Sequence, residues 1–228
     1  MAEEGEPPEG QPPLRILYHA MLGRAGAVVR MCEEKGQPYE FISDFPELAK
    51  VCGAFGAAES GTFAPPVVQD GDVTVSQSGA CTMYIGEKLG LSAGVPNAAV
   101  AMQHLCDIGD WVVECGNAFS AIKELAPEEA VQSLQAFAQK RFVQWVAVLE
   151  QSIVGPFYYG AEATYVDYFL VSSVDWLQEV WLKGLPVWET GCAKIMAVVA
   201  SIRALASYAD YAGPLKTVRD GFPTLAPE

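Results

Sequence analysis

The chain has 228 residues, of which 51% are hydrophobic and 18% are charged, so it carries enough apolar material for a sizeable globular core. Its formal net charge of −14 at pH 7 argues against nucleic acid or an anionic membrane as the main partner, because both need a basic protein face. The sequence has no secretory signal and no apolar run near the roughly 18 residues of a membrane span, so we expect a cytoplasmic protein.

Residues 1–13 are acidic and proline-rich, which predicts a disordered or extended tail. Residues 14–20 read as a short strand, 23–36 as a helix and 39–43 as a second strand, and this order indicates a parallel strand pair. Residues 46–64 are rich in glycine and alanine and are predicted to be a loop.

The stretch 64–90 contains two short strands, PVVQ and DVTVS, on either side of the turn signal Asp70-Gly71. A helix is predicted from about Ser78 to Leu89, with Ser78 as its N-cap. From residue 97 onward the apolar spacing is helical, and Thr164 and Asp167 have the spacing of a capping box. We therefore predict an α/β domain over 14–91 and an all-α domain over 97–228 that ends in a C-terminal tail.

Residues 64–80 could bind a small peptide-like ligand. Pro66 begins a strand, and a cis bond there would turn the backbone of Ala64-Pro65 outward to pair with an extended ligand. Ser78 at a helix N-terminus offers a hydroxyl and free N–H groups to an anion, and Gln77 adds an amide. The alternative is a hairpin followed by a capped helix, and the residues alone leave both open.

The sequence contains few residues suited to other catalytic chemistries. The six cysteines include no C-x-x-C pair, and we expect them to be reduced and packed. The two histidines, His19 and His104, give little material for a zinc site or a Ser-His-Asp triad, so we expect no metal.

Four segments resemble the cytosolic glutathione transferases, tyrosine-type and sigma-like: LYHAMLGRA (17–25), DFPELAK (44–50), PVVQDGDVTVSQSGA (66–80) and GPFYYGAEATYVDYFL (155–170). They fall in the family's order, and the resemblance covers residues 14–212. It implies a thioredoxin-like N-terminal domain, an all-α C-terminal domain and usually a homodimer.

The resemblance also implies the chemistry. Tyr18 would be the catalytic hydroxyl that stabilises the thiolate of glutathione, the co-substrate, whose free thiol has a pKa of about 8.5. Arg24 would support the site electrostatically. Glutathione itself would be bound by six further residues: Phe45, Lys50, Pro65, Pro66 (the cis-proline), Gln77 and Ser78.

This chain departs from the family pattern at several positions. Gly26 replaces a frequent glutamate, and Phe45 replaces a tryptophan whose indole N–H is then missing. Lys50 is one residue out of register, and loop 51–63 is longer than the sigma-like pattern. These changes put the strength of glutathione binding in doubt.

The electrophile pocket is expected to include Met21 and Leu22, while Trp111 could face substrate or lie in the core. Asp107, Asp110 and Glu114 form either a solvated stripe or a pocket wall at a dimer cleft. The interpretation that follows is a dimeric glutathione transferase that conjugates glutathione to hydrophobic electrophiles. The alternatives are a glutathione-dependent isomerase and a non-catalytic interaction module.

Overall fold

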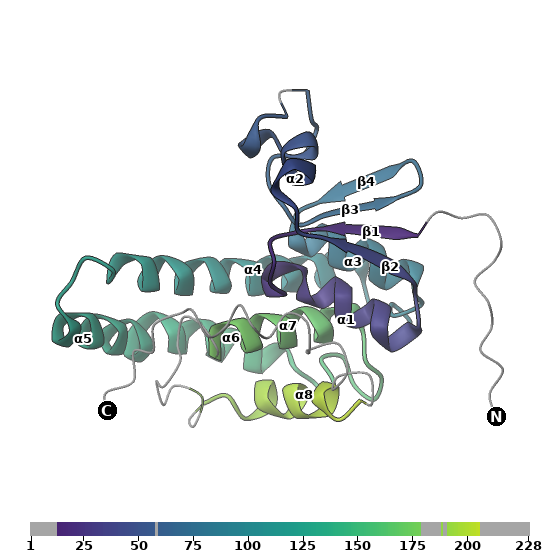
Figure 1. The fold of residues 1–228 in the computed structure, drawn as a ribbon. Helices are drawn as coiled ribbons and strands as arrows, with labels where there is room; N and C mark the ends of the chain where they lie inside the picture. The colour runs from purple at the N-terminus through teal and green to yellow at the C-terminus, as the bar shows by residue number, and fades with distance from the viewer. Residues whose placement is uncertain (1–12, 58, 179–187, 189–190, 206–228) are drawn as a thin grey trace.

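A computed structural model describes residues 13–57, 59–178, 188 and 191–205, and shows a small sheet with helices followed by a helical region (Figure 1). The strands are β1 (Leu14–Leu17), β2 (Tyr39–Ile42), β3 (Val67–Asp70) and β4 (Val73–Ser76). They form a four-stranded sheet of order β2-β1-β3-β4, in which β1 is parallel to β2 and antiparallel to β3. The expected parallel pair and the expected hairpin are both confirmed.

Helices cover both faces of the sheet. Helices α1 (Gly26–Lys35) and α3 (Ser78–Lys88) lie on the face that is turned toward the helical region, and α2 (Phe45–Val51) lies on the other (Figure 1). Because side chains alternate along a strand, Ile16 and Val68 join the main core while Leu17 and Val67 pack with Leu48 of α2.

Two local predictions were wrong. The stretch 46–64 is not all loop, since α2 and a short 3₁₀ turn (Gly53–Phe55) begin within or beside it. Leu48 is the only buried residue of α2, so a helix this short leaves almost no apolar stripe to read. The N-cap of α3 is Gln77 and not Ser78. Ser78 is the first residue of the helix, so α3 begins one residue earlier than expected.

The helical region is built around one buried helix, α7 (Tyr165–Trp176), in which every residue except Trp176 is buried. Its predicted capping box is confirmed, because Asp167 accepts hydrogen bonds from the backbone N–H of Thr164 (2.7 Å) and of Tyr158 (2.6 Å). The helices around it are α4 (Ala98–Ala121), α5 (Pro127–Phe137), a π-helical turn (Ala138–Phe142), α6 (Val143–Ser152) and α8 (Ala193–Arg203).

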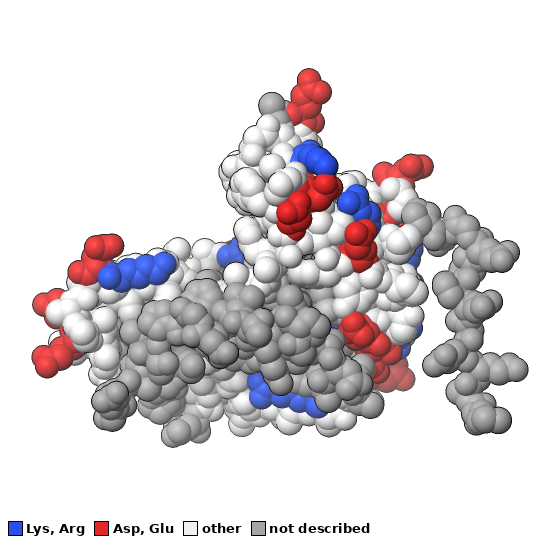
Figure 2. Space-filling model, in the orientation of Figure 1, with Lys and Arg blue, Asp and Glu red and all other residues white. Residues whose placement is uncertain are grey.

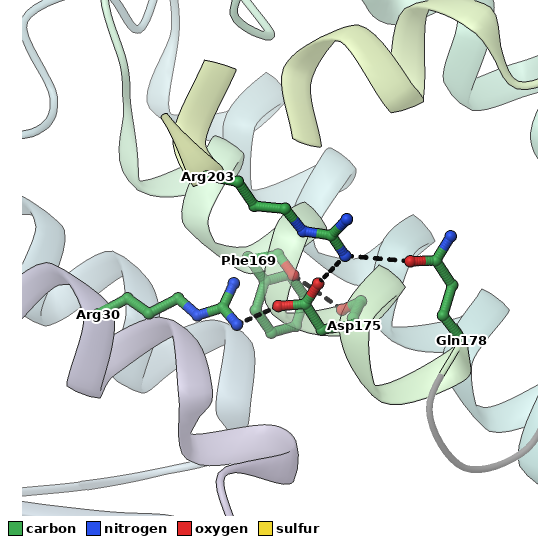
Figure 3. A network of polar contacts seen from close by, with 6 residues as sticks. Arg30, Phe169, Asp175, Gln178 and Arg203 are labelled. Carbon is green, nitrogen blue, oxygen red and sulfur yellow. Dashed lines mark hydrogen bonds and ion pairs between the residues drawn. The ribbon is translucent and has the colours of Figure 1, made fainter. Parts of the chain in front are cut away.

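An ion-pair network joins the two regions (Figure 3). Asp175 of α7 accepts from Arg30 of α1 and from Arg203 of α8, and Arg203 also donates to the Gln178 side chain at 3.0 Å. Arg30 and Asp175 are each only 4% exposed. Because a buried charge is costly without its partner, this network fixes α1 against α7.

The surface gives little sign of a basic binding face. On the face shown in Figure 2, most basic side chains lie beside acidic ones. Two of the ion pairs of the described residues are Lys50–Glu47 and Arg141–Glu114. No helix within the described ranges is both long enough and apolar enough to span a membrane. The N-terminal tail (1–12) and the tail from residue 213 lie outside the described residues.

Candidate active site

Tyr18 lies directly after β1, with its side chain directed toward the turn that precedes α1. The backbone N–H of Arg24 donates to the Tyr18 hydroxyl oxygen at 3.2 Å. A Cβ on Gly23 would lie 2.9 Å from the same oxygen, and Gly23 has a φ of +36°, so glycine is required for this approach. Because the hydroxyl acts as an acceptor toward Arg24, its own hydrogen remains available to a ligand.

The protonation of Tyr18 follows from its surroundings. Burial raises the pKa of the Tyr18 phenol, and the N–H and the positive charge of Arg24 oppose that rise only in part. Tyr18 is therefore a protonated donor at neutral pH and not a base.

The start of the stretch 64–80, which was predicted to bind a peptide-like ligand, has the expected backbone conformation. The Pro65-Pro66 bond is cis, as expected for Pro66. Pro66 is buried, whereas Ala64 and Pro65 are half-buried at the start of β3.

Gln77 has a φ of +75°, the only positive φ of a non-glycine residue within the described part of the chain. Such a conformation is uncommon for a residue with a side chain and is often found at functional sites. It holds the exposed Gln77 side chain at the N-terminus of α3, next to the half-buried Ser78. The first N–H groups of α3 have no partner within the helix, so an anion can be bound there.

A cavity of about 350 Å³ opens between the sheet region and the helical region. One wall comes from Gly23, Arg24 and the start of α3, and the others come from α4 and α7. Its lining on α4 and α7 is mostly apolar: Met102, Leu105, Cys106, Gly109, Asp110, Val112, Val113, Phe169, Ser172, Ser173 and Trp176. A largely apolar cavity beside a few polar groups is the common form of a small-molecule site.

The structure separates the expected pocket residues from this cavity. Trp111 is fully buried in the helical core, with its ring 5.6 Å from that of Phe142. Met21 and Leu22 pack against the core and are not among the cavity-lining residues.

The three acidic residues of α4 lie in different surroundings. Asp110 lines the cavity. Glu114 instead pairs with Arg141, whose Nε lies 2.9 Å from its carboxylate, and Asp107 lies 3.4 Å from the Gln103 amide.

The α2 residues lie at the outer side of the site. Phe45 is 60% exposed, and its ring packs against Phe55, which in turn contacts the His19 imidazole. The ring of His19 lies 5.1 Å from that of Tyr18, so an aromatic series runs from Tyr18 to Phe45. Lys50 is exposed and paired with Glu47, so it would have to exchange this partner to bind a ligand carboxylate.

The cysteine thiols offer no obvious nucleophile inside the core. All six cysteines are free, and only Cys106 is exposed. Burial raises the pKa of the Cys32 and Cys81 thiols to about 12 and that of Cys192 to about 11, so these groups stay protonated at neutral pH. Within the described ranges, no group of three or more His, Cys, Asp or Glu side chains could hold a metal ion.

Comparisons with known proteins agree with this architecture. Residues 110–213 match the family model of the glutathione S-transferase C-terminal domain. The match covers the helical region, and the sheet region is related to glutathione transferases through the fold alone. Among curated sequences, no glutathione transferase or other protein matches it.

Two solved glutathione transferases and a solved prostaglandin synthase share the fold at low identity. The sigma-class enzyme of Fasciola hepatica is 13% identical, with a TM-score of 0.64 over 94% of this chain and 99% of the other. The Pi-class enzyme of Onchocerca volvulus is 14% identical, with a TM-score of 0.65 over 91% and 96%. Prostaglandin synthase D of Nilaparvata lugens is 14% identical, with a TM-score of 0.62 over 93% and 100%. These likenesses confirm the thioredoxin-like plus all-α fold, and more than one transferase class shares it.

The residues that the sequence did not identify come from α4 and from α7, and α7 is the helix on which the sequence analysis placed no site residue. Phe169, Ser172, Ser173 and Trp176 line the cavity although α7 is the most buried helix of the transferase fold here. The available signal was the pair of adjacent serines inside this largely apolar helix.

Proposed function

We propose that the protein is a glutathione transferase that conjugates the glutathione thiolate to hydrophobic electrophiles. The proposal depends on one observation: the Tyr18 hydroxyl accepts the Arg24 N–H, which leaves its own hydrogen for a ligand, and it lies beside Gly23 and Arg24, which line a mostly apolar cavity. This arrangement supports a reaction between a bound thiol and an apolar molecule.

Tyr18 would donate its hydrogen bond to the glutathione sulfur. A donor at that position stabilises the thiolate, lowers the thiol pKa from about 8.5 and raises the reactive fraction at neutral pH. The positive charge of Arg24 would add to this effect. The nucleophile would belong to glutathione, since five of the chain's own cysteines are buried.

The rest of glutathione would extend along the start of β3. The backbone at Ala64-Pro65 would pair with its cysteinyl part, and Gln77 with Ser78 at the α3 N-terminus would bind the γ-glutamyl carboxylate. Phe45 and Lys50 would bind the glycine end. We further propose a cytoplasmic homodimer, because this is the usual state in the family that the sequence resembles.

Two alternatives each have an observation in their favour. A glutathione-dependent isomerase is favoured by the fold shared with a prostaglandin synthase. A non-catalytic interaction module is favoured by Phe45, whose side chain has no N–H to donate to a ligand, and by the Lys50–Glu47 pair. The exposed Gln77 and the Tyr18 geometry favour an enzyme over such a module.

The test compares wild type with Tyr18→Phe. We expect both to bind glutathione in calorimetry with dissociation constants within about threefold, and Tyr18→Phe to conjugate an aryl halide roughly 10- to 100-fold more slowly, since a positioned donor is lost. The thiol of bound glutathione should also titrate nearer 8.5 in the variant. Absence of glutathione binding by wild type would rule out both enzyme functions, and equal turnover would remove the role of Tyr18.

A further inference from the structure

His19 is an exposed histidine that directly follows Tyr18 at the end of β1. The centre of its ring lies 5.1 Å from that of Tyr18 and 6.1 Å from that of Phe55, edge to face in both cases. A hydrogen bond from the backbone N–H of Met21 to the His19 carbonyl, 2.6 Å long, closes this turn. Within the described residues the imidazole makes these ring contacts and no hydrogen bond or ion pair, so its nitrogens are available to a ligand.

The place of His19 beside bound glutathione follows from the two ends of that tripeptide. With the sulfur at Tyr18 and the γ-glutamyl carboxylate at the N-terminus of α3, the glycine end would extend to the opposite side, toward α2. His19 lies on that side, because its ring contacts Phe55, which packs against Phe45 of α2. Successive Cα atoms are about 3.8 Å apart, so the glycine carboxylate would lie close to the rings beside Tyr18.

The other side chains at this end of the site leave the glycine carboxylate short of a donor. The Phe45 side chain has no N–H, and the Lys50 ammonium group is already paired with Glu47. The 3₁₀ turn Gly53–Phe55 carries no charged side chain. The His19 imidazole is therefore a donor that can bind the carboxylate without first giving up a partner.

We infer that His19 is a binding residue for glutathione and that its imidazole donates a hydrogen bond to the glycine carboxylate. The inference rests on the proposed function and assigns one further residue to the same site. A hydrogen bond to a charged acceptor is stronger than one between neutral groups, and the protonated imidazolium adds an opposite charge. The contribution of His19 to the affinity is therefore larger at low pH.

The test compares glutathione with its glycine ethyl ester, which lacks the glycine carboxylate and keeps the thiol and the γ-glutamyl end. Both ligands are titrated into the full chain by calorimetry at pH 5.5 and pH 8. In wild type we expect a preference for glutathione over the ester. His19→Phe keeps a ring against Tyr18 and Phe55 and should reduce this preference about fivefold at pH 5.5 and about twofold at pH 8. Its affinity for the ester should stay within twofold of wild type.

Other groups near the site do not account for such a pH dependence. The thiol is common to both ligands, so its titration cancels in the ratio of the two affinities. Burial raises the pKa of Tyr18, and the hydrogen bond from Lys50 lowers the pKa of Glu47, so neither residue changes charge between pH 5.5 and pH 8.

Two further variants separate the imidazole from its alternatives. His19→Gln retains a donor that does not titrate, so its preference for glutathione should be the same at both pH values. Lys50→Met combined with Glu47→Gln removes the alternative cation together with its partner. This double variant should reduce the preference by less than His19→Phe does.

Three results would overturn the inference: an equal preference in wild type and His19→Phe, equal weakening of both ligands in that variant, or a preference in His19→Gln that depends on pH as in wild type. All three leave glutathione bound and the proposed function intact. If His19→Phe did not fold, the comparison of His19→Gln with wild type would decide alone. Failure of wild type to bind either ligand would overturn the proposed function and the inference together.

Discussion

His104 is a largely buried imidazole on α4 whose Nδ1 lies 2.7 Å from the hydroxyl of Tyr159. Burial lowers the pKa of His104 below 6.5, and the carboxylate of Asp107 opposes this shift only in part. Between the folded and unfolded pKa values the unfolded chain binds more protons. The stabilising contribution is therefore complete above about pH 6.5 and decreases as pH falls below it.

We expect the free energy of unfolding to fall from pH 7 to pH 5 by more in wild type than in His104→Gln, which cannot titrate. Urea unfolding at the two pH values measures both differences, and all other titrating groups are common to the two proteins. Equal decreases would show that the imidazole is protonated as easily in the folded protein as in the unfolded chain.

For single residues, the sequence predicts a role where the partners are close along the chain. The hydroxyl of Tyr18 meets Arg24 six residues later, and Gln77 adjoins Ser78, so short motifs contain these parts of the site. Ser172 is different, because its surroundings depend on Gly26 from a distant helix. No local pattern contains that contact.

Trp111 is a second residue whose position could not be predicted from the local sequence. A helix with 3.6 residues per turn directs Trp111 and Asp110 to different faces, and only the packing of α4 decides which face meets the cavity. The structure directs Asp110 toward the cavity and Trp111 into the core.

Among the elements, α3 and α7 approach each other closely at Gly86. A Cβ there would lie 2.2 Å from the Cβ of Tyr165, which is the first residue of α7. We expect Gly86→Ala to lower the free energy of unfolding by about 2–3 kcal/mol, because the two helices would have to move apart in a packed core. Urea unfolding measures the change.

Gly109 on α4 is the matched control. Among the described residues, no atom beyond its chain neighbours and the backbone of its own helix lies within 4 Å of the position of its Cβ, and it also sits inside a helix. Gly109→Ala should raise stability by about 0.5–1 kcal/mol through helix propensity alone. Similar effects of the two substitutions would mean that the approach of α3 to α7 is not tight in solution.

The elements themselves were predictable where they are long or periodic. The capping box of α7 and the hairpin at Asp70-Gly71 are local signals that the structure confirms. Helix α2 was missed because seven residues with one buried side chain, Leu48, give no period to recognise.

For the whole molecule, the network around Asp175 joins the sheet region to the helical region through Arg30. Asp175→Asn removes the buried carboxylate charge to which Arg30 and Arg203 both donate, which should cost about 3–5 kcal/mol of unfolding free energy. Replacing both residues by apolar ones, Arg30→Met with Asp175→Leu, should cost less than the single change, because no buried charge remains at the contact between the two helices. Arg203 keeps its contact with Gln178 in both variants.

The two regions can be followed separately during unfolding. All five tryptophans lie at or after residue 111, so their fluorescence reports the helical region. Cys32, Cys52 and Cys81 are buried in the sheet region, and their labelling by a thiol reagent, located by mass spectrometry, reports its opening. In wild type we expect both signals to change at the same urea concentration, because the network makes the regions unfold together. In Asp175→Asn the three cysteines should become reactive at lower urea than the tryptophan transition, and the double variant should restore the coincidence. Coincident transitions in Asp175→Asn would show that the apolar packing of α1 on α7 couples the regions without the ion pair.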